Sequence, residues 1–415
     1  MQKNLSTICL LLIITSLFSQ KVKAEIKNIR IAHFIADDIS TIPDDFLQYA
    51  QSCGYNYLLA HGNNIGLSSG KSDWRNPTTM DIDGTYDIKW AKSNISLYNK
   101  LKDLFNRADM YGLRVIPCFN MSSRWAGHWT TTNKNIALNT GTDKTGRNWR
   151  VPVFIADPNG IDKSFQSYLS VVSSAFRDAN TRYSQLDYIH IGHDETMGFD
   201  GKLLIGRWNN AEKTWIQKNG NNASAFCKLM AEEVIRRVNV IKATLPGTKA
   251  IIWADAWDPE SNGGNSAYKG WTSGGWISVQ TKDVVTRSEL SILKNDLVLM
   301  PWQYTPEYAT GDGYAPDISL QYFKDNGFKV IVGTSLNDFP GWPPEDSRIM
   351  NKEWVSISKD SRFKDVVIGC CCHTWSNDGM YWNSIPKPIR FQILPEFAKM
   401  AGFFPNIQPT SGPVQ

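Results

Sequence analysis

The chain has 415 residues, of which 42% are hydrophobic and 20% are charged, so it can bury a large core, and an intrinsically disordered protein is excluded. Its formal net charge is only +4, and Lys and Arg are interleaved with Asp and Glu, which argues against a nucleic-acid-binding protein. The unusual feature is the aromatic content of 12%, which includes 16 tryptophans.

The N-terminus has the layout of a secretory signal peptide. Lys3 precedes an apolar run over residues 8–18, and a small-residue cleavage signal follows at residues 22–24. We therefore expect residues 1–24 to be removed and residues 25–415 to form the mature protein. The apolar run is too short to span a bilayer comfortably, and no later segment is long enough. The sequence thus predicts a soluble exported protein, periplasmic or extracellular, without a membrane anchor.

The cysteines of the mature chain do not form a regular disulfide framework. They are Cys53, Cys118, Cys227 and a run at residues 370–372. Neighbouring residues of a strand point to opposite faces, so we interpret the run as small core residues. Metal binding by the run is the less favoured alternative, because no second Cys or His pair lies nearby at zinc-finger spacing. We predict neither a metal nor a cofactor.

Apolar runs of strand length alternate along the chain with stretches of helical periodicity. In chain order, the predicted strands are residues 29–35, 55–60, 113–119, 186–191, 249–253, 297–302, 328–334 and 366–373. The apolar faces of the predicted helices are marked by Phe46, Leu47 and Ala50, by residues 97–108, 165–176 and 226–241, and by a last helix at 388–401. An irregular insertion with Trp74 and Trp90 precedes the second helix, and a long loop covers residues 120–158.

Continuous apolar strands that alternate with helices predict a parallel sheet buried on both faces. Eight repeats, without a second block of elements or a dividing linker, predict closure into a single (β/α)8 TIM barrel. The alternative is an open doubly wound sheet. Its phosphate-binding Gly-x-Gly-x-x-Gly turn is absent after the first strand, where residues 32–35 read Ala-His-Phe-Ile.

The active site of such a barrel forms at the C-terminal ends of its strands. Polar and aromatic residues at those ends are His33, Asp37, Asp38, His61, Asn63, Asn120, Arg124, His128, His193, Asp194, Glu195, Asp255, Trp257, Asp258, Trp302, Gln303, Tyr304, Asn337, Asp338, His373, Trp375, Asn377 and Asp378. For a single Asp or Asn, capping of a strand is the simpler interpretation. The adjacent pair Asp194 and Glu195 favours catalysis, because two like charges after a buried strand are costly and perturb each other's pKa.

Glycoside hydrolysis fits this pair, since it requires one carboxylic acid to protonate the leaving oxygen and a second group to act at the anomeric carbon. The apolar face of a sugar ring also packs on aromatic rings. Tryptophans at or just after strand ends are Trp125, Trp129, Trp208, Trp257, Trp302, Trp342 and Trp375. A single one of them is usually a core residue, but their recurrence on the predicted active face favours a carbohydrate substrate.

The sequence His-Ile-Gly-His-Asp-Glu at residues 190–195 closely resembles the His-Ile-Gly-Gly-Asp-Glu signature on the fourth strand of glycoside hydrolase family 20, the β-N-acetylhexosaminidases. Residues 112–117 look like that family's third strand and residues 126–128 like its Pro-Gly-His turn. Trp302 is similar to its sixth-strand Trp, and residues 375–377 to its eighth-strand Trp-x-Glu. The resemblance covers most of the mature chain, with the fourth-strand motif as its specific part.

This resemblance implies that Glu195 is the general acid/base and that Asp194 orients the substrate's 2-acetamido group. The acetamido oxygen is then the nucleophile, so the reaction passes through an oxazolinium ion and retains configuration. Asp194 must stay ionised while Glu195 starts protonated. The substrate-binding residues that we predict are His128, His193, Trp257, Trp302, Tyr304, Asp338, Trp375 and Asn377. For His193, orienting the acid pair and plain packing are equally good interpretations.

Several departures from the family pattern leave the identity of the substrate sugar undecided. The first strand follows the signal peptide so closely that we do not expect the family's small α/β domain before the barrel. The family's sugar-binding Arg after the first strand has no clear counterpart, its seventh-strand Tyr is replaced around residues 336–338, and Asn377 stands in place of an acid. A galacto-configured, substituted or internal N-acetylhexosamine is compatible with these changes, as expected of a divergent subfamily.

The sequence leaves three other hypotheses open. A retaining glycosidase with an enzyme nucleophile would use Asp338 opposite Glu195. A metal-dependent barrel hydrolase would use His33, His61, His193 and Asp255, although the His-x-His of its first strand is absent. A sugar-binding barrel without catalysis is suggested by the missing Arg and by Asn377.

Overall fold

The structure of the chain is a computed structural model. The residues that it describes are 29–36, 39–62, 86–121, 141–142, 148–149, 161–193, 214–215, 217–220, 223–254, 257–258, 292–302, 316–335, 344–373 and 387–402. The predicted signal peptide and the long loop at residues 122–140 lie outside them.

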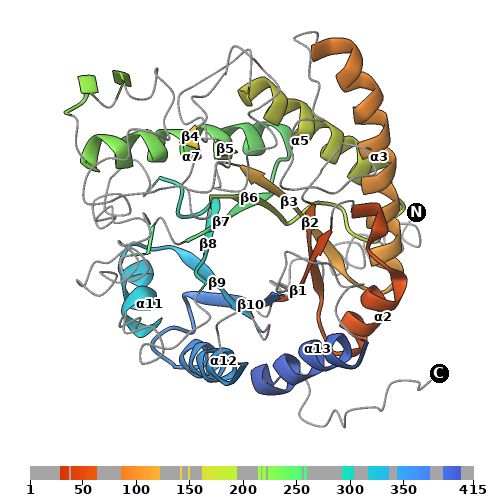
Figure 1. Cartoon of the computed structure of the whole chain (residues 1–415), viewed down its shortest axis with the longest axis vertical. Coiled ribbons are helices and arrows are strands. Elements are labelled where there is room, and N and C mark those ends of the chain that lie inside the picture. The colour runs from red at the N-terminus through yellow and green to blue at the C-terminus, as the bar shows by residue number, and fades with distance from the viewer. Residues whose placement is uncertain are drawn as a thin grey trace, which may run out of the picture.

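The core of the molecule is a closed barrel of parallel strands, seen end-on in Figure 1. Its strands are β1 (Ile29–Ala36), β2 (Tyr57–Gly62), β3 (Arg114–Met121), β6 (Tyr188–Gly192), β7 (Lys249–Trp253), β8 (Leu297–Met300), β9 (Lys329–Ser335) and β10 (Val367–His373). They follow one another around the ring in chain order, and β10 pairs with β1 to close it. The predicted (β/α)8 TIM barrel is confirmed, and β6 is its fourth strand.

Helices surround the barrel on its outside (Figure 1). They are α2 (Asp44–Ser52), α3 (Tyr86–Met110), α5 (Ile161–Asp178), α7 (Ala223–Thr244), α11 (Pro316–Asp325), α12 (Pro344–Ser358) and α13 (Lys387–Ala401). A 3-10 turn, η1 (Ile39–Thr41), follows β1, and a small hairpin of β4 (Gly141–Thr142) and β5 (Asn148–Trp149) lies between β3 and α5. The interpretation of Trp90 as part of an irregular insertion was wrong, because α3 begins at Tyr86.

Alternate residues of each strand enter two separate apolar clusters, as the two-residue period of a strand requires. On β1, Ile31 points into the barrel while Ala32 and Phe34 face the helices. On β10, Cys371 lies inside and Cys370 and Cys372 lie outside, and all three are free and buried. The interpretation of the cysteine run as small core residues on alternate faces is confirmed.

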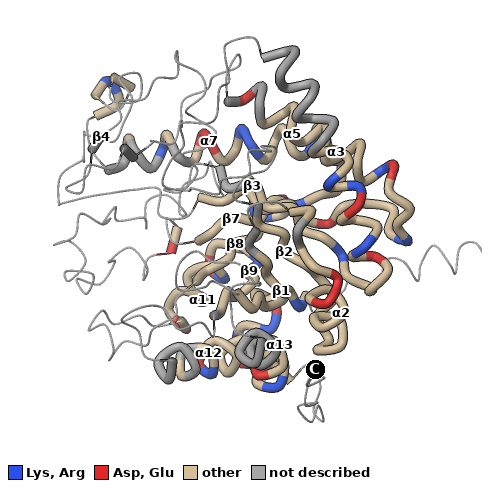
Figure 2. Tube along the Cα trace, turned by 45° about the vertical axis from the view of Figure 1, so that its right-hand side comes forward, with Lys and Arg blue, Asp and Glu red and all other residues tan. Residues whose placement is uncertain are grey.

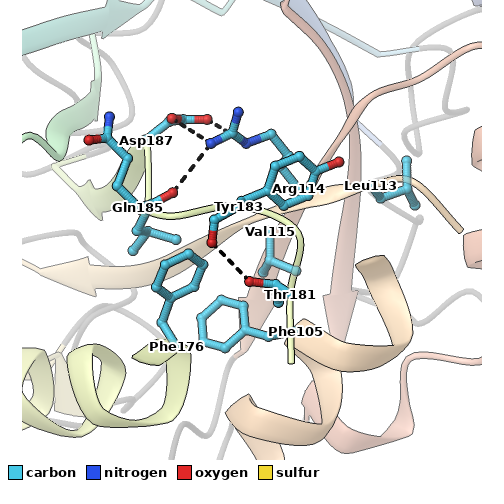
Figure 3. A pocket seen from close by; sticks show the side chains of 10 residues that line it. Phe105, Leu113, Arg114, Val115, Phe176, Thr181, Tyr183, Gln185 and Asp187 are labelled. Atoms are coloured by element: carbon cyan, nitrogen blue, oxygen red, sulfur yellow. Dashed lines mark hydrogen bonds and ion pairs between the residues drawn. The ribbon is translucent and has the colours of Figure 1, made fainter. Parts of the chain in front are cut away.

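The N-terminal end of the barrel is held by an ion pair between Arg114, at the start of β3, and Asp187, just before β6. The Arg114 guanidinium donates to both carboxylate oxygens at 2.6 and 2.7 Å. The hydroxyl of Tyr57 on β2 also donates to Asp187 at 2.7 Å. Arg114 and Asp187 are among the residues that line a small pocket (Figure 3). Its volume is about 10 Å³, which is about the room that one water molecule needs. We therefore expect this end of the barrel to contribute to stability.

Charged residues of both signs occur along the outer helix α3, whereas α2 carries only the acidic Asp44 and Asp45 (Figure 2). Within the described residues, no helix is long and apolar enough to cross a membrane. The mixed surface agrees with the low net charge of the sequence.

Candidate active site

Among the described residues, histidines form the last interior layer of the barrel, near the C-terminal ends of its strands. On β1 the inward residues are Ile29, Ile31 and then His33, and on β2 Tyr57 and Leu59 lead in the same way to His61. His190 of β6 and His373 of β10 occupy the corresponding places, since both rings contact Trp253, an interior residue of β7.

The four rings of this histidine layer, His33, His61, His190 and His373, lie close together. Nε2 of His33 is 3.3 Å from Nδ1 of His61, and the ring of His33 meets that of His373 edge-on, with 5.3 Å between centroids. Burial lowers the pKa of all four, to about 4 for His61 and about 3 for His373, and nearby imidazoles lower the pKa of His33, His190 and His373 further. The layer is therefore neutral at pH 7, when each imidazole has one donor and one acceptor nitrogen.

The backbone orients His190, the first residue of the sequence motif. Nδ1 of His190 accepts a hydrogen bond from the N–H of Gly192 at 3.1 Å, and Sγ of Cys118 lies 3.6 Å from the same nitrogen. The proton of this neutral ring is thus on Nε2, which is buried and has no hydrogen-bond partner among the described residues. His190 is left with an uncommitted donor in the last interior layer.

His193, directly after β6, has an unusual backbone. Its φ is +74°, and it is the one non-glycine residue with positive φ in the described part of the chain. Gly192 before it also has positive φ, at +82°. A left-handed conformation is uncommon for residues other than glycine, although His adopts it more often than most. Two residues with positive φ thus stand in succession where the buried strand ends.

The side chain of His193 leaves the barrel and enters a buried ionic network in the helix layer. Its Nε2 lies 2.5 Å from Oε2 of Glu233 on α7, and both side chains are fully buried. Arg237, one helical turn further on and also fully buried, donates to Oε1 of Glu233 at 2.8 Å and pairs with Asp162 of α5. Arg236 contacts the same Asp162 at 3.3 Å.

Glu233 is ionised in this network. Burial alone would raise the pKa of Glu233, but its interaction and hydrogen bond with His193, together with Arg237 and Arg236, hold that pKa at about 2. Sequence reasoning missed Glu233 and Arg237. A signal existed, because both lie on the face of α7 that carries the buried apolar residues Leu229, Val234, Val238 and Ile241, and a charged residue on such a face needs a buried partner.

The structure describes three of the predicted site residues. His193 lies in the network with Glu233. Trp302 follows β8, forms a bridge with Gly333 of β9 and packs on the interior cluster. Trp257 is fully buried in the cluster between the strands and the helices. Its part in substrate binding stays a prediction. Outside the described residues lie Asp194, Glu195, His128, Tyr304, Asp338, Trp375 and Asn377.

The side chains that a metal-dependent hydrolase would use as ligands do not point toward one place. His33 and His61 face each other inside the barrel, whereas His193 is directed at Glu233 in the helix layer, and Asp255 lies outside the described residues. In the described ranges, no group of three or more His, Cys, Asp or Glu residues has the arrangement of a metal site.

No protein-family model and no curated protein matches the sequence, but solved structures match the fold. One is a family 20 exo-β-N-acetylglucosaminidase from Vibrio harveyi in complex with N-acetylglucosamine, with a TM-score of 0.51, 11% identity and coverage of 91% of this chain. Another is the pneumococcal virulence factor StrH, with the same TM-score and identity and coverage of 92% of this chain and 86% of that one. The likeness shows the fold. The chain spans 54% of the length of the Vibrio harveyi enzyme.

Proposed function

We propose that the chain is a glycoside hydrolase that cleaves β-linked N-acetylhexosamine by a substrate-assisted, retaining mechanism. The observation that supports it best is the position of the motif at residues 190–195. Its strand, β6, is the fourth of a closed parallel barrel and ends at Gly192, so that Asp194 and Glu195 follow in the chain at the face where such barrels carry their active sites. The solved structures with this fold include a family 20 exo-β-N-acetylglucosaminidase.

In the proposed reaction, Glu195 donates a proton to the glycosidic oxygen as the bond to the anomeric carbon breaks. The carbonyl oxygen of the substrate's 2-acetamido group forms the new bond to that carbon, which gives an oxazolinium ion. Asp194 orients the acetamido group and stabilises its positive charge. Water then attacks the anomeric carbon, Glu195 accepts a proton from it, and the bond between that carbon and the acetamido oxygen breaks. The product therefore keeps the β configuration.

The described residues at this end of the barrel also fit a sugar. Trp302 offers a ring at the end of β8, and the histidine layer offers neutral donors and acceptors, including the uncommitted Nε2–H of His190. We further infer that Trp375 and Tyr304 contribute to the acetamido pocket, and that His128, Asp338 and Asn377 bind the substrate.

A panel of aryl β-glycosides, gluco- and galacto-configured and with or without the 2-acetamido group, tests the proposal. We expect turnover of the N-acetylated substrates alone, a β-configured first product by proton NMR, and inhibition by an N-acetylglucosamine thiazoline. Glu195→Gln should reduce kcat by roughly 100- to 10,000-fold, the usual size of general acid-base catalysis, with an unchanged melting temperature.

Two results would favour the alternatives. Equal turnover of substrates that lack the acetamido group, with trapping by a 2-fluoro sugar, would indicate an enzyme nucleophile such as Asp338. Tight binding of N-acetylhexosamine without turnover of any aryl glycoside would indicate a sugar-binding barrel.

A further inference from the structure

We propose that His193 is a positioning residue that anchors the acid pair to the helix layer through Glu233. The inference rests on the proposed function, because it concerns the geometry of Asp194 and Glu195. The Nε2 of His193 lies 2.5 Å from Oε2 of Glu233 and neither side chain is exposed. The residue directly before the acid pair is thus tied to α7, and through Arg237 to α5.

The contact with Glu233 can hold the unusual backbone conformation of His193 in place. Residues with positive φ other than glycine persist where the surrounding structure holds them in place. At His193, with φ of +74°, the described contact that can hold the side chain is the one to Glu233. The family 20 signature, which the motif resembles, has Gly at this place. Gly tolerates the same φ but has no side chain to hold it.

The network behind Glu233 makes the anchor stiff. Glu233 is fixed from its other oxygen by Arg237, whose guanidinium also pairs with Asp162 in the first turn of α5 and lies over the ring of Phe165, 5.3 Å from its centroid. Asp162 sits where the helix dipole favours a carboxylate. Because each of these side chains is held by at least two contacts, a displacement of His193 would disturb α5 and α7 together.

This stiffness matters for catalysis because the acid and the orienting carboxylate must reach their substrate atoms at the same time. A misplacement of about 1 Å is enough to reduce a rate roughly 100-fold. Asp194 is joined to His193 by a planar peptide bond, so its Cα follows the position of His193 directly. A positioning role of this kind acts on kcat more than on KM.

The test compares His193→Gly, His193→Gln and Glu233→Gln with the wild type on an aryl N-acetyl-β-hexosaminide. His193→Gly keeps the backbone conformation and loses the anchor, so we expect kcat to fall roughly 10- to 100-fold with KM within about twofold. His193→Gln keeps an N–H donor that can reach Glu233 and should recover a large part of that loss. Glu233→Gln should lower kcat in the same direction as His193→Gly.

Asp187→Asn is the matched control. It weakens an ion pair at the opposite end of the same strand, so it should lower the melting temperature and leave kcat and KM within about twofold. All variants are assayed well below the lowest melting temperature, with circular dichroism to verify folding.

The outcomes separate this inference from the proposed function. Wild-type and Glu195→Gln chains are compared first, and a wild type without turnover above Glu195→Gln would overturn both. If the wild type is active and His193→Gly keeps its kcat, only the anchoring role is wrong, and His193 is a packing residue. Equal losses in His193→Gly and His193→Gln with a matching loss in Asp187→Asn would likewise overturn it.

Discussion

Nε2 of His33 on β1 and Nδ1 of His61 on β2 lie 3.3 Å apart inside the barrel. One of these nitrogens must donate and the other accept, so the contact exists only while at least one ring is neutral. Both rings are buried, with exposures of 0% and 3%. The pair therefore links the protonation of the histidine layer to the stability of the fold.

The histidine layer predicts a loss of stability in mild acid. Burial lowers the pKa of all four imidazoles in the folded chain, to about 4 for His61 and about 3 for His373, whereas the unfolded chain takes up protons near pH 6.5. The stability that the neutral histidines contribute is thus fully present above pH 6.5. The free energy of unfolding decreases as the pH falls from there toward the pKa values of the folded chain. Each histidine contributes about 1.4 kcal/mol per pH unit. Urea unfolding between pH 7.5 and 4.5 measures the slope.

A single substitution checks the origin of that slope. His61→Gln removes one titrating group, so its unfolding free energy should depend on pH less steeply than that of the wild type, by about 1.4 kcal/mol per unit. Glu233 does not affect the slope in this range. Its pKa is lowered from 4.5 to about 2 in the folded chain, so the stability that its ionised form contributes is lost only as the pH falls below about 4.5. Equal slopes for wild type and variant would contradict the assignment.

Gly333 leaves room for His373. A Cβ at Gly333 would lie 2.6 Å from Cε1 of His373 and 3.0 Å from the carbonyl oxygen of Pro301. We expect Gly333→Ala to lower the free energy of unfolding by about 1–3 kcal/mol, as overpacking of a core does. In a His373→Ala background the same change should cost less, because only the contact with Pro301 remains. Denaturant melts of the four chains give this coupling energy, and additive costs would show that the two residues do not compete for space.

The Arg114–Asp187 pair predicts a stability effect without a catalytic one. Its side chains are 18% and 19% exposed, and the carboxylate also accepts from Tyr57. A double-mutant cycle of Arg114→Met and Asp187→Asn should give a coupling energy of about 1–3 kcal/mol. The exposed pair of Arg107 and Asp103 on α3, where Asp103 is 56% exposed, should give about 0.5 kcal/mol. Similar values for the two cycles would contradict a special role for this end of the barrel.

Most of the fold could be predicted because its signals are local. Buried parallel strands read as apolar runs, and the observed bounds of β7 at Lys249–Trp253 are the predicted ones. The second strand begins at Tyr57, two residues later than predicted, because Gly54 with φ of +84° ends the turn after α2 and Tyr55 packs with the helices. Such an offset depends on tertiary packing and not on apolar periodicity.

The candidate site was less predictable from the sequence, because its contacts join residues far apart in the chain. His193 and Glu233 are separated by 40 positions, and no local pattern pairs them. The histidine layer illustrates the same limit. The sequence identifies His33, His61 and His373 individually as strand-end residues. The pairing of β1 with β2 brings His61 to His33, and the closure of β10 onto β1 brings His373 to the same ring.

Trp257 and Trp302 follow successive strands, and the structure predicts different roles for them. Trp257 is fully buried between strands and helices, so Trp257→Ala should lower the free energy of unfolding by about 3–5 kcal/mol, as loss of a core Trp does. Trp302 is partly buried at the end of β8 beside Gly333. If it contacts sugar, Trp302→Ala should raise KM for an aryl N-acetyl-β-hexosaminide several-fold with a smaller loss of stability.

Phenylalanine variants separate packing from binding at these two positions. Trp257→Phe keeps most of the buried ring and should recover over half of the stability lost in Trp257→Ala, with KM unchanged if the ring does not meet the sugar. Trp302→Phe keeps a smaller aromatic face and should have a KM between those of the wild type and Trp302→Ala. Urea melts and initial rates on the same preparations measure both quantities. A raised KM in Trp257→Phe at wild-type stability would instead place Trp257 against the substrate, as the sequence resemblance implies.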